Sequence, residues 1–65
     1  MGRAANHPLK AIRLKRGLSL RQLARLSGIS WMTIWRIEQG KTEPTVATLR
    51  KLAQALNVAI VDLLD

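Results

Sequence analysis

The sequence contains no cysteine, phenylalanine or tyrosine, and it has only four acidic residues and one histidine. The lack of cysteine excludes disulfides and thiolate zinc sites as sources of stability. One histidine and four acidic residues are few potential ligands, which disfavours any other metal site. No segment approaches the roughly 20 apolar residues of a membrane span, and the N-terminus lacks the apolar core of a signal peptide. We therefore expect no cofactor, no metal, no membrane contact, and a cytoplasmic location.

With 65 residues, the chain is expected to form one small domain, 1–65, in which 1–6 is a flexible arm without periodicity. A domain of this size buries only about 60% of the surface that its unfolded chain exposes, which leaves no room for a deep catalytic cavity. His7 has no second histidine or cysteine to act with, and a serine nucleophile has no base. We therefore expect no enzymatic activity and interpret His7 as a solvated residue before the first helix.

Positive charge dominates the sequence and is concentrated in its N-terminal part. Eleven lysine and arginine residues stand against four acidic ones, which gives a formal net charge of +7. Such a balance is typical of a protein that binds a polyanion; a generic solubilising surface charge is the alternative. A basic membrane-binding helix is disfavoured, because the apolar residues fall into short segments separated by glycine. The following basic residues all precede the first acidic residue, Glu38: Arg3, Lys10, Arg13, Lys15, Arg16, Arg21 and Arg25.

Helix start and stop signals divide the first half of the chain. Pro8 suits the first position of a helix, where its missing N–H costs nothing. Gly17 is placed to end that helix in a left-handed conformation. Ser19 and Gln22 have the spacing of a capping box at the start of a second helix, which Gly28 ends.

The second half of the chain continues this pattern. Ser30 begins a third helix that Gly40 ends, Thr45 caps a fourth that reaches Asn57, and residues 60–64 are expected to form a short fifth helix. No strand-like alternation appears, so the sequence predicts an all-α domain of five short helices. Apolar residues at helical spacing predict its core: Leu9, Ile12, Leu20, Leu23, Ala24, Ile34, Ile37, Leu49, Leu52, Ala53, Leu56, Ile60, Leu63 and Leu64.

The second and third helices form the unit that indicates a function. They are joined by a short turn around Gly28, and two helices joined at a steep angle by a three- to four-residue turn make a DNA-binding helix-turn-helix. The second helix of such a unit fits the major groove, which is about 12 Å wide, with its first residues at the base edges. We therefore expect a helix-turn-helix at 19–39 with the recognition helix at 30–39, double-stranded DNA as the partner, and association with the nucleoid if the source is bacterial.

At this point the sequence closely resembles the phage repressor and Cro family of helix-turn-helix domains, also called the xenobiotic-response-element type. The resemblance covers residues 9–64 without insertion or deletion. It implies a compact five-helix, lambda-repressor-like domain that binds specific double-stranded DNA sequences in transcriptional control. The residues that carry it are Arg13, Gly17-Leu18-Ser19, Leu23-Ala24, Gly28-Ile29-Ser30, Ile34, Arg36-Ile37-Glu38, Gly40-Lys41, Pro44, Leu49, Leu52-Ala53, Leu56 and Leu63-Leu64.

The resemblance also implies roles for individual positions. Arg13 and Glu38 match a structural ion pair that joins the first helix to the end of the third. The positions expected at base edges in the groove are Trp31, Met32, Thr33, Trp35 and Arg36, with Arg36 as the first choice for pairing with guanine. The positions expected at the DNA backbone are Ser19, Arg21, Ser30, Gln39, Lys41 and Thr42.

Two features depart from the family pattern. Leu20 stands where the family usually has a glutamine that reaches a phosphate, and either Arg21 or Gln22 is the candidate replacement. The recognition helix is also unusually apolar, and Trp31 and Trp35 are neighbours on its surface at i and i+4. Three interpretations of these tryptophans stay open: burial in the core, packing in the DNA groove on methyls or sugars, and a protein-interaction patch.

The sequence leaves further alternatives. A protein-interaction module, antitoxin-like, would use the face of Trp31, Met32 and Trp35, although the basic charge argues against it. A homodimer on a palindromic site and a monomer are equally compatible with the sequence. The chain stops where the fifth helix is complete, so an engineered DNA binder on this scaffold is an alternative to a natural regulator.

Overall fold

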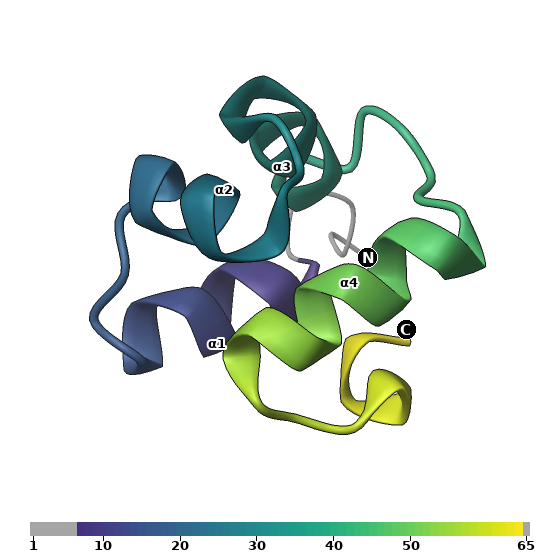
Figure 1. The fold of residues 1–65 in the computed structure, drawn as a ribbon. Coiled ribbons are helices and arrows are strands. Elements are labelled where there is room, and N and C mark those ends of the chain that lie inside the picture. The colour runs from purple at the N-terminus through teal and green to yellow at the C-terminus, as the bar shows by residue number, and fades with distance from the viewer. Residues whose placement is uncertain (1–6, 65) are drawn as a thin grey trace.

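The computed structural model describes residues 7–64, and these residues form helices and connecting turns without a strand. The predicted arm, 1–6, lies outside the described residues. Four α-helices follow one another along the chain, and a short 3-10 helix, η1, comes after the fourth (Figure 1). Their bounds are Pro8–Lys15 for α1, Leu20–Ser27 for α2, Trp31–Glu38 for α3, Val46–Leu56 for α4 and Ile60–Leu63 for η1.

The predicted count of five helices is therefore not confirmed: the described residues form four α-helices, and where a short fifth helix was expected, at 60–64, Ile60–Leu63 form a single 3-10 helix. Backbone bonds here span three residues: Asp62 N–H donates to the Ala59 carbonyl at 2.9 Å, and Leu64 N–H donates to Val61 at 3.2 Å. The Asp62 carboxylate accepts from the Ala59 N–H at 3.2 Å and holds this tight turn. Leu64 then returns to an extended conformation. So short a segment cannot accumulate the bonds that favour an α-helix.

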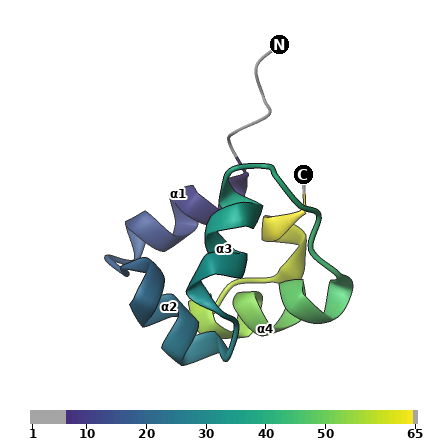
Figure 2. The ribbon, with the colours of Figure 1, turned by 90° about the horizontal axis from the view of Figure 1, so that it is seen from above.

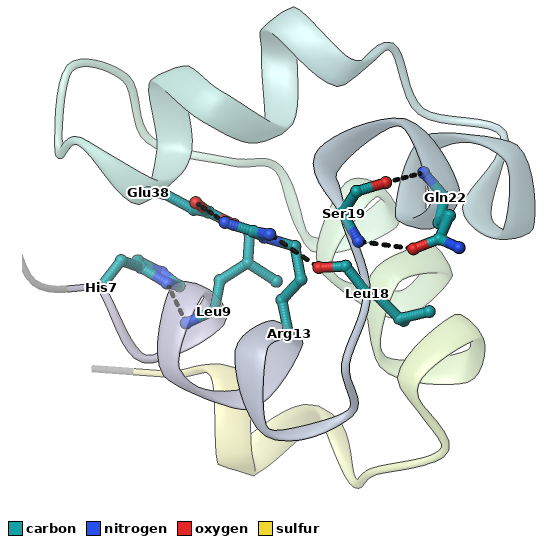
Figure 3. Close-up of polar contacts among 7 residues, drawn as sticks. All are labelled: His7, Leu9, Arg13, Leu18, Ser19, Gln22 and Glu38. Carbon is teal, nitrogen blue, oxygen red and sulfur yellow. Dashed lines mark hydrogen bonds and ion pairs between the residues drawn. The ribbon is translucent and has the colours of Figure 1, made fainter.

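Side-chain caps begin each of the four α-helices. The predicted capping box is present: the Gln22 N–H donates to Ser19 Oγ at 3.0 Å, and the Ser19 N–H donates to Gln22 Oε1 at 2.8 Å (Figure 3). Thr45 Oγ1 accepts from the Thr48 N–H at 3.1 Å at the start of α4. His7 corrects the sequence interpretation, because its Nδ1 accepts from the Leu9 N–H at 3.0 Å and its ring is half-buried. His7 therefore caps α1 rather than lying in solvent.

The turn between α2 and α3 depends on a left-handed residue. Gly28 has φ 76° and its N–H donates to the Ala24 carbonyl at 2.8 Å, which closes α2. Ser27 Oγ accepts from the Ile29 N–H at 3.1 Å and supports the same turn. A side chain at position 28 would meet no neighbouring atom, so the requirement for glycine is conformational rather than steric.

Every element contributes to one apolar core. Leu63 closes this core from η1, but Leu64 is 52% exposed, so the prediction that both leucines would be buried was wrong for Leu64. Several other predicted core residues, among them Leu20 and Ile60, are only partly buried and pack against the core from its edge. The fully or nearly fully buried apolar residues are Leu9, Leu23, Ile34, Ile37, Leu49, Leu52, Ala53, Leu56 and Leu63.

The packing leaves one side of α3 facing outward. In Figure 1, α3 lies at the top of the molecule, above α1 and α4, while η1 lies at the bottom. Seen from above in Figure 2, α3 lies across the near face of the molecule. The core holds α3 from below, so the opposite side of this helix is available to a partner.

Candidate nucleic-acid interface

The two sides of α3 differ sharply in exposure. Ile34 and Ile37 are fully buried. Trp31, Met32 and Trp35 are 42%, 44% and 38% exposed. The core interpretation of the tryptophans is therefore wrong, and the groove and protein-patch interpretations remain.

The exposed side of α3 is hollowed. Trp31, Met32, Trp35 and Arg36 line a shallow hollow of about 260 Å³, called the α3 hollow below. Three of its four lining side chains are apolar, and the fourth carries a guanidinium. Lys41, beyond the end of α3, places its Nζ 5.7 Å from the centre of the Trp35 ring. This is a cation–π contact, and it holds a second positive charge beside the hollow.

The ion pair expected between α1 and α3 is present and buried. Arg13 Nε donates to Glu38 Oε2 at 2.7 Å, and Nη2 donates to Glu38 Oε1 at 3.1 Å (Figure 3). Nη1 of the same guanidinium donates to the Leu18 carbonyl at 2.8 Å, just before α2. One guanidinium therefore ties α1, the α1–α2 turn and the end of α3 together. This buried pair holds the end of α3 against α1.

Hydroxyl and amide groups lie at the starts of α2 and α3. Ser30 Oγ accepts from the Met32 N–H at 3.2 Å and caps α3, as Ser19 caps α2. Each serine hydroxyl uses its oxygen as an acceptor for the cap and keeps its own proton to donate. Gln22 uses its amide oxygen in the capping box, so its NH₂ group is left to donate. Arg21, next to it, is exposed.

The exposed charges of residues 7–42 are all of one sign. Glu38, the carboxylate of α3, is 1% exposed and paired with Arg13. The remaining acids of the described residues, Glu43 and Asp62, follow α3 in the chain and are exposed. Across residues 7–42 no carboxylate therefore faces solvent. The exposed cations of the same span are Lys10, Lys15, Arg16, Arg21, Arg25, Arg36 and Lys41.

Two features of this site were missed by sequence reasoning. The α3 hollow needs the relative placement of four side chains, for which the sequence holds no signal beyond the i, i+4 spacing of the tryptophans. The bond from Arg13 to the Leu18 carbonyl joins a side chain to a turn, and no sequence pattern marks it.

Two other residues that were predicted to contact the DNA backbone follow α3. Thr42 is exposed and Gln39 is half-buried.

Other kinds of site find little support in the described residues. Across residues 7–64 there is no group of three or more histidine, cysteine or acidic residues that could hold a metal ion. Every buried side-chain nitrogen or oxygen in this span has a hydrogen-bond partner. None of the helices described is both long and apolar enough to span a membrane.

Comparison with known proteins agrees with this geometry. The model of the helix-turn-helix family HTH_3 matches residues 9–63. The chain is 43% identical over 58 residues to the HTH-type transcriptional regulator SutR of Escherichia coli, covering 89% of this chain and 33% of that protein. It is 49% identical over 51 residues to the HTH-type transcriptional repressor RghR of Bacillus subtilis, covering 77% of this chain and 38% of that protein.

Solved structures share the fold as well. The restriction-modification controller protein C.AhdI from Aeromonas hydrophila superposes with a TM-score of 0.85 at 31% identity, covering 89% of this chain and 88% of that one. An HTH_3 family transcriptional regulator from Vibrio cholerae superposes with a TM-score of 0.83 at 41% identity, covering 86% and 32%. The chain spans about a third of the length of the curated relatives SutR and PuuR of Escherichia coli. The chain belongs to the helix-turn-helix family HTH_3, and its relatives SutR and RghR are transcriptional regulators.

Proposed function

We propose that residues 7–64 act as one DNA-binding domain that recognises a specific duplex sequence by inserting α3 into the major groove, and that it serves transcriptional control in the cytoplasm. The observation that carries this proposal is the exposed side of α3, where Arg36 and three large apolar side chains line one hollow, in a span of the chain, 7–42, without an exposed carboxylate. Phosphate contacts from lysine and arginine supply most of the affinity, and α3 supplies the specificity.

Base recognition is assigned to the first two turns of α3. Arg36 is exposed and its planar fork can pair with O6 and N7 of a guanine. Trp31, Met32 and Trp35 pack on apolar parts of the groove. Thr33 is exposed, and its hydroxyl can form a hydrogen bond with either a donor or an acceptor on a base edge.

Backbone contacts are assigned to both ends of the helix-turn-helix. The serine hydroxyls at the α2 and α3 caps donate to phosphates, and the unpaired N–H groups of a helix start favour an anion at the same place. Leu20 has no polar group to offer a phosphate, and Gln22 is better placed than Arg21 to do so, because the capping box already orients its amide. The assigned backbone residues are Ser19, Arg21, Gln22, Ser30, Gln39, Lys41 and Thr42.

The test is a selection of the chain on random duplexes, followed by titration with the winner, called the selected duplex below. Both tryptophans of the chain lie on α3, so their emission reports directly on this helix. We expect a clear fluorescence change with the selected duplex, saturating together with an independent binding assay, and a much smaller one with unrelated DNA. A palindromic winner supports a homodimer, and an asymmetric one a monomer.

A partner protein on the same face is the second candidate, because Trp31, Met32 and Trp35 are exposed together. It predicts no winner in the selection and no change in tryptophan emission with DNA. The exposed charges of residues 7–42 are all positive, which favours DNA.

Replacing Lys41 by alanine separates phosphate contact from base contact. If about six phosphates are neutralised, the plot of log affinity against log salt concentration has a slope of about −5. We expect Lys41→Ala to weaken binding to all sequences alike and to flatten this slope by about one unit. Lys51 is an exposed lysine on α4. Lys51→Ala is therefore the matched control, and it is expected to leave the slope unchanged. An unchanged slope for Lys41→Ala removes this residue from the phosphate contacts.

A further inference from the structure

The α3 hollow is mostly apolar, whereas most base edges are polar. Trp31, Met32 and Trp35 make its apolar lining, and Arg36 adds one guanidinium. A major-groove base edge is a row of hydrogen-bond donors and acceptors, and its one apolar group is the C5-methyl of thymine. Among the base edges, an apolar hollow on α3 is therefore matched by this methyl group.

The size of the hollow fits such an occupant. Its volume of about 260 Å³ far exceeds the roughly 10–15 Å³ that one water needs on the same measure, so a methyl group has room to enter it. Arg36 forms part of the wall, so its guanidinium can reach a base next to the one that enters the hollow. A guanine there can accept both donors of Arg36 on O6 and N7.

The charge around the hollow favours DNA over another protein as the occupant. Lys41 lies beside it above Trp35, Arg36 forms part of its wall, and the carboxylate of α3, Glu38, is buried and neutralised by Arg13. A protein partner would bury these two cations at a cost, whereas phosphates on both sides of a major groove complement them.

We propose that the α3 hollow selects a pyrimidine carrying a C5-methyl group, placed beside a guanine that Arg36 binds. The methyl packs between the two tryptophans and Met32, and it displaces water from apolar surface. Specificity at this position then rests on the presence of the methyl rather than on a hydrogen-bond code. The inference depends on the proposed function, because it names what α3 reads in the duplex.

Deoxyuridine substitution tests this directly, because it removes only the C5-methyl of thymine and keeps its base pairing. Each thymine of the selected duplex is replaced in turn. We expect affinity to fall about fourfold at the thymine beside the guanine, the effect of removing one buried methyl-sized group, and to stay constant elsewhere. With cytosine at that position, methylation at C5 is expected to strengthen binding by a similar factor.

Variants assign the effect to the hollow. Trp31→Ala is expected to bring the ratio of the two affinities, thymine over deoxyuridine, close to one. Met32→Ala repeats the test if the first variant melts at a much lower temperature than the parent. Val61→Ala removes an exposed apolar side chain from η1, away from α3 (Figure 1), and is expected to keep the parent ratio.

Two outcomes overturn the inference while the proposed function stands: equal affinity for thymine and deoxyuridine at every position, or a ratio that neither variant changes. Failure to select any duplex overturns the proposed function as well, so the two failures are distinguishable.

Discussion

Replacing Glu38 by alanine is expected to lower the free energy of unfolding by about 3–5 kcal/mol, the cost of leaving one charge of a buried pair without its partner. Glu38 is 1% exposed and accepts two hydrogen bonds from Arg13. Its removal leaves a buried guanidinium with the Leu18 carbonyl as its one remaining partner. A domain of this length has a free energy of unfolding of roughly 3–10 kcal/mol. The expected loss is therefore a large part of the total stability.

Thermal unfolding followed by circular dichroism measures this effect. Each kcal/mol corresponds to about 4–8 °C in a domain of this size, so the melting temperature falls far or the variant is largely unfolded at room temperature. Glu43→Ala, which removes the same charge from an exposed position, is the control and is expected to change little.

A double replacement separates charge from packing. Arg13→Met with Glu38→Leu removes both charges at once and is expected to be much less destabilised than the sum of the single changes, because no charge is left buried alone. A parent-like melting temperature for Glu38→Ala, combined with loss of DNA binding, is the result that contradicts a structural role for the pair.

Replacing Arg36 by alanine is expected to cost about 1–3 kcal/mol of binding free energy on the selected duplex and little on random DNA, because base contacts specify and phosphate contacts do not. Arg36 is exposed, so its truncation leaves the core intact and the melting temperature near that of the parent. The measurement is the ratio of affinities for the selected and a random duplex at one salt concentration.

Two variants sharpen this prediction. Arg36→Lys keeps the charge but loses the planar fork, so it is expected to retain binding to random DNA and to lose specificity for the selected duplex. Arg50→Ala removes an equal charge from α4 and is expected to leave the ratio unchanged. Equal losses on both duplexes for Arg36→Ala reassign this residue to the phosphate backbone.

Much of the helix layout could be predicted from short stretches of sequence. The starts at Pro8, Ser19, Ser30 and Thr45 all agree with the structure, and so does the end at Gly28. These signals are local, because a cap bonds an amide two or three residues away and a left-handed glycine closes the turn just before it. His7 escaped this reasoning because histidine is not among the common capping residues, although its Nδ1 does the same work.

The placement of the tryptophans was harder to predict. The spacing of Ile34 and Ile37 predicted that both face the core, and both are fully buried. Helix α3, Trp31–Glu38, carries further apolar residues around most of its circumference, so its periodicity left the position of Trp31 and Trp35 open, and packing decided that both are exposed. Leu63 and Leu64 are adjacent and chemically identical, yet the 3-10 helix buries only the first.

The sequence alone thus determined an all-helical chain, the helix-turn-helix at 19–39 and a basic N-terminal half, because local bonds, helical spacing and charge are properties of the chain itself. Tertiary structure alone decided that both tryptophans of α3 are exposed, and it decided the third bond of Arg13 and the exposure of Leu64. Each of these depends on groups that only packing brings together, and burial is a property of the packed molecule rather than of any segment.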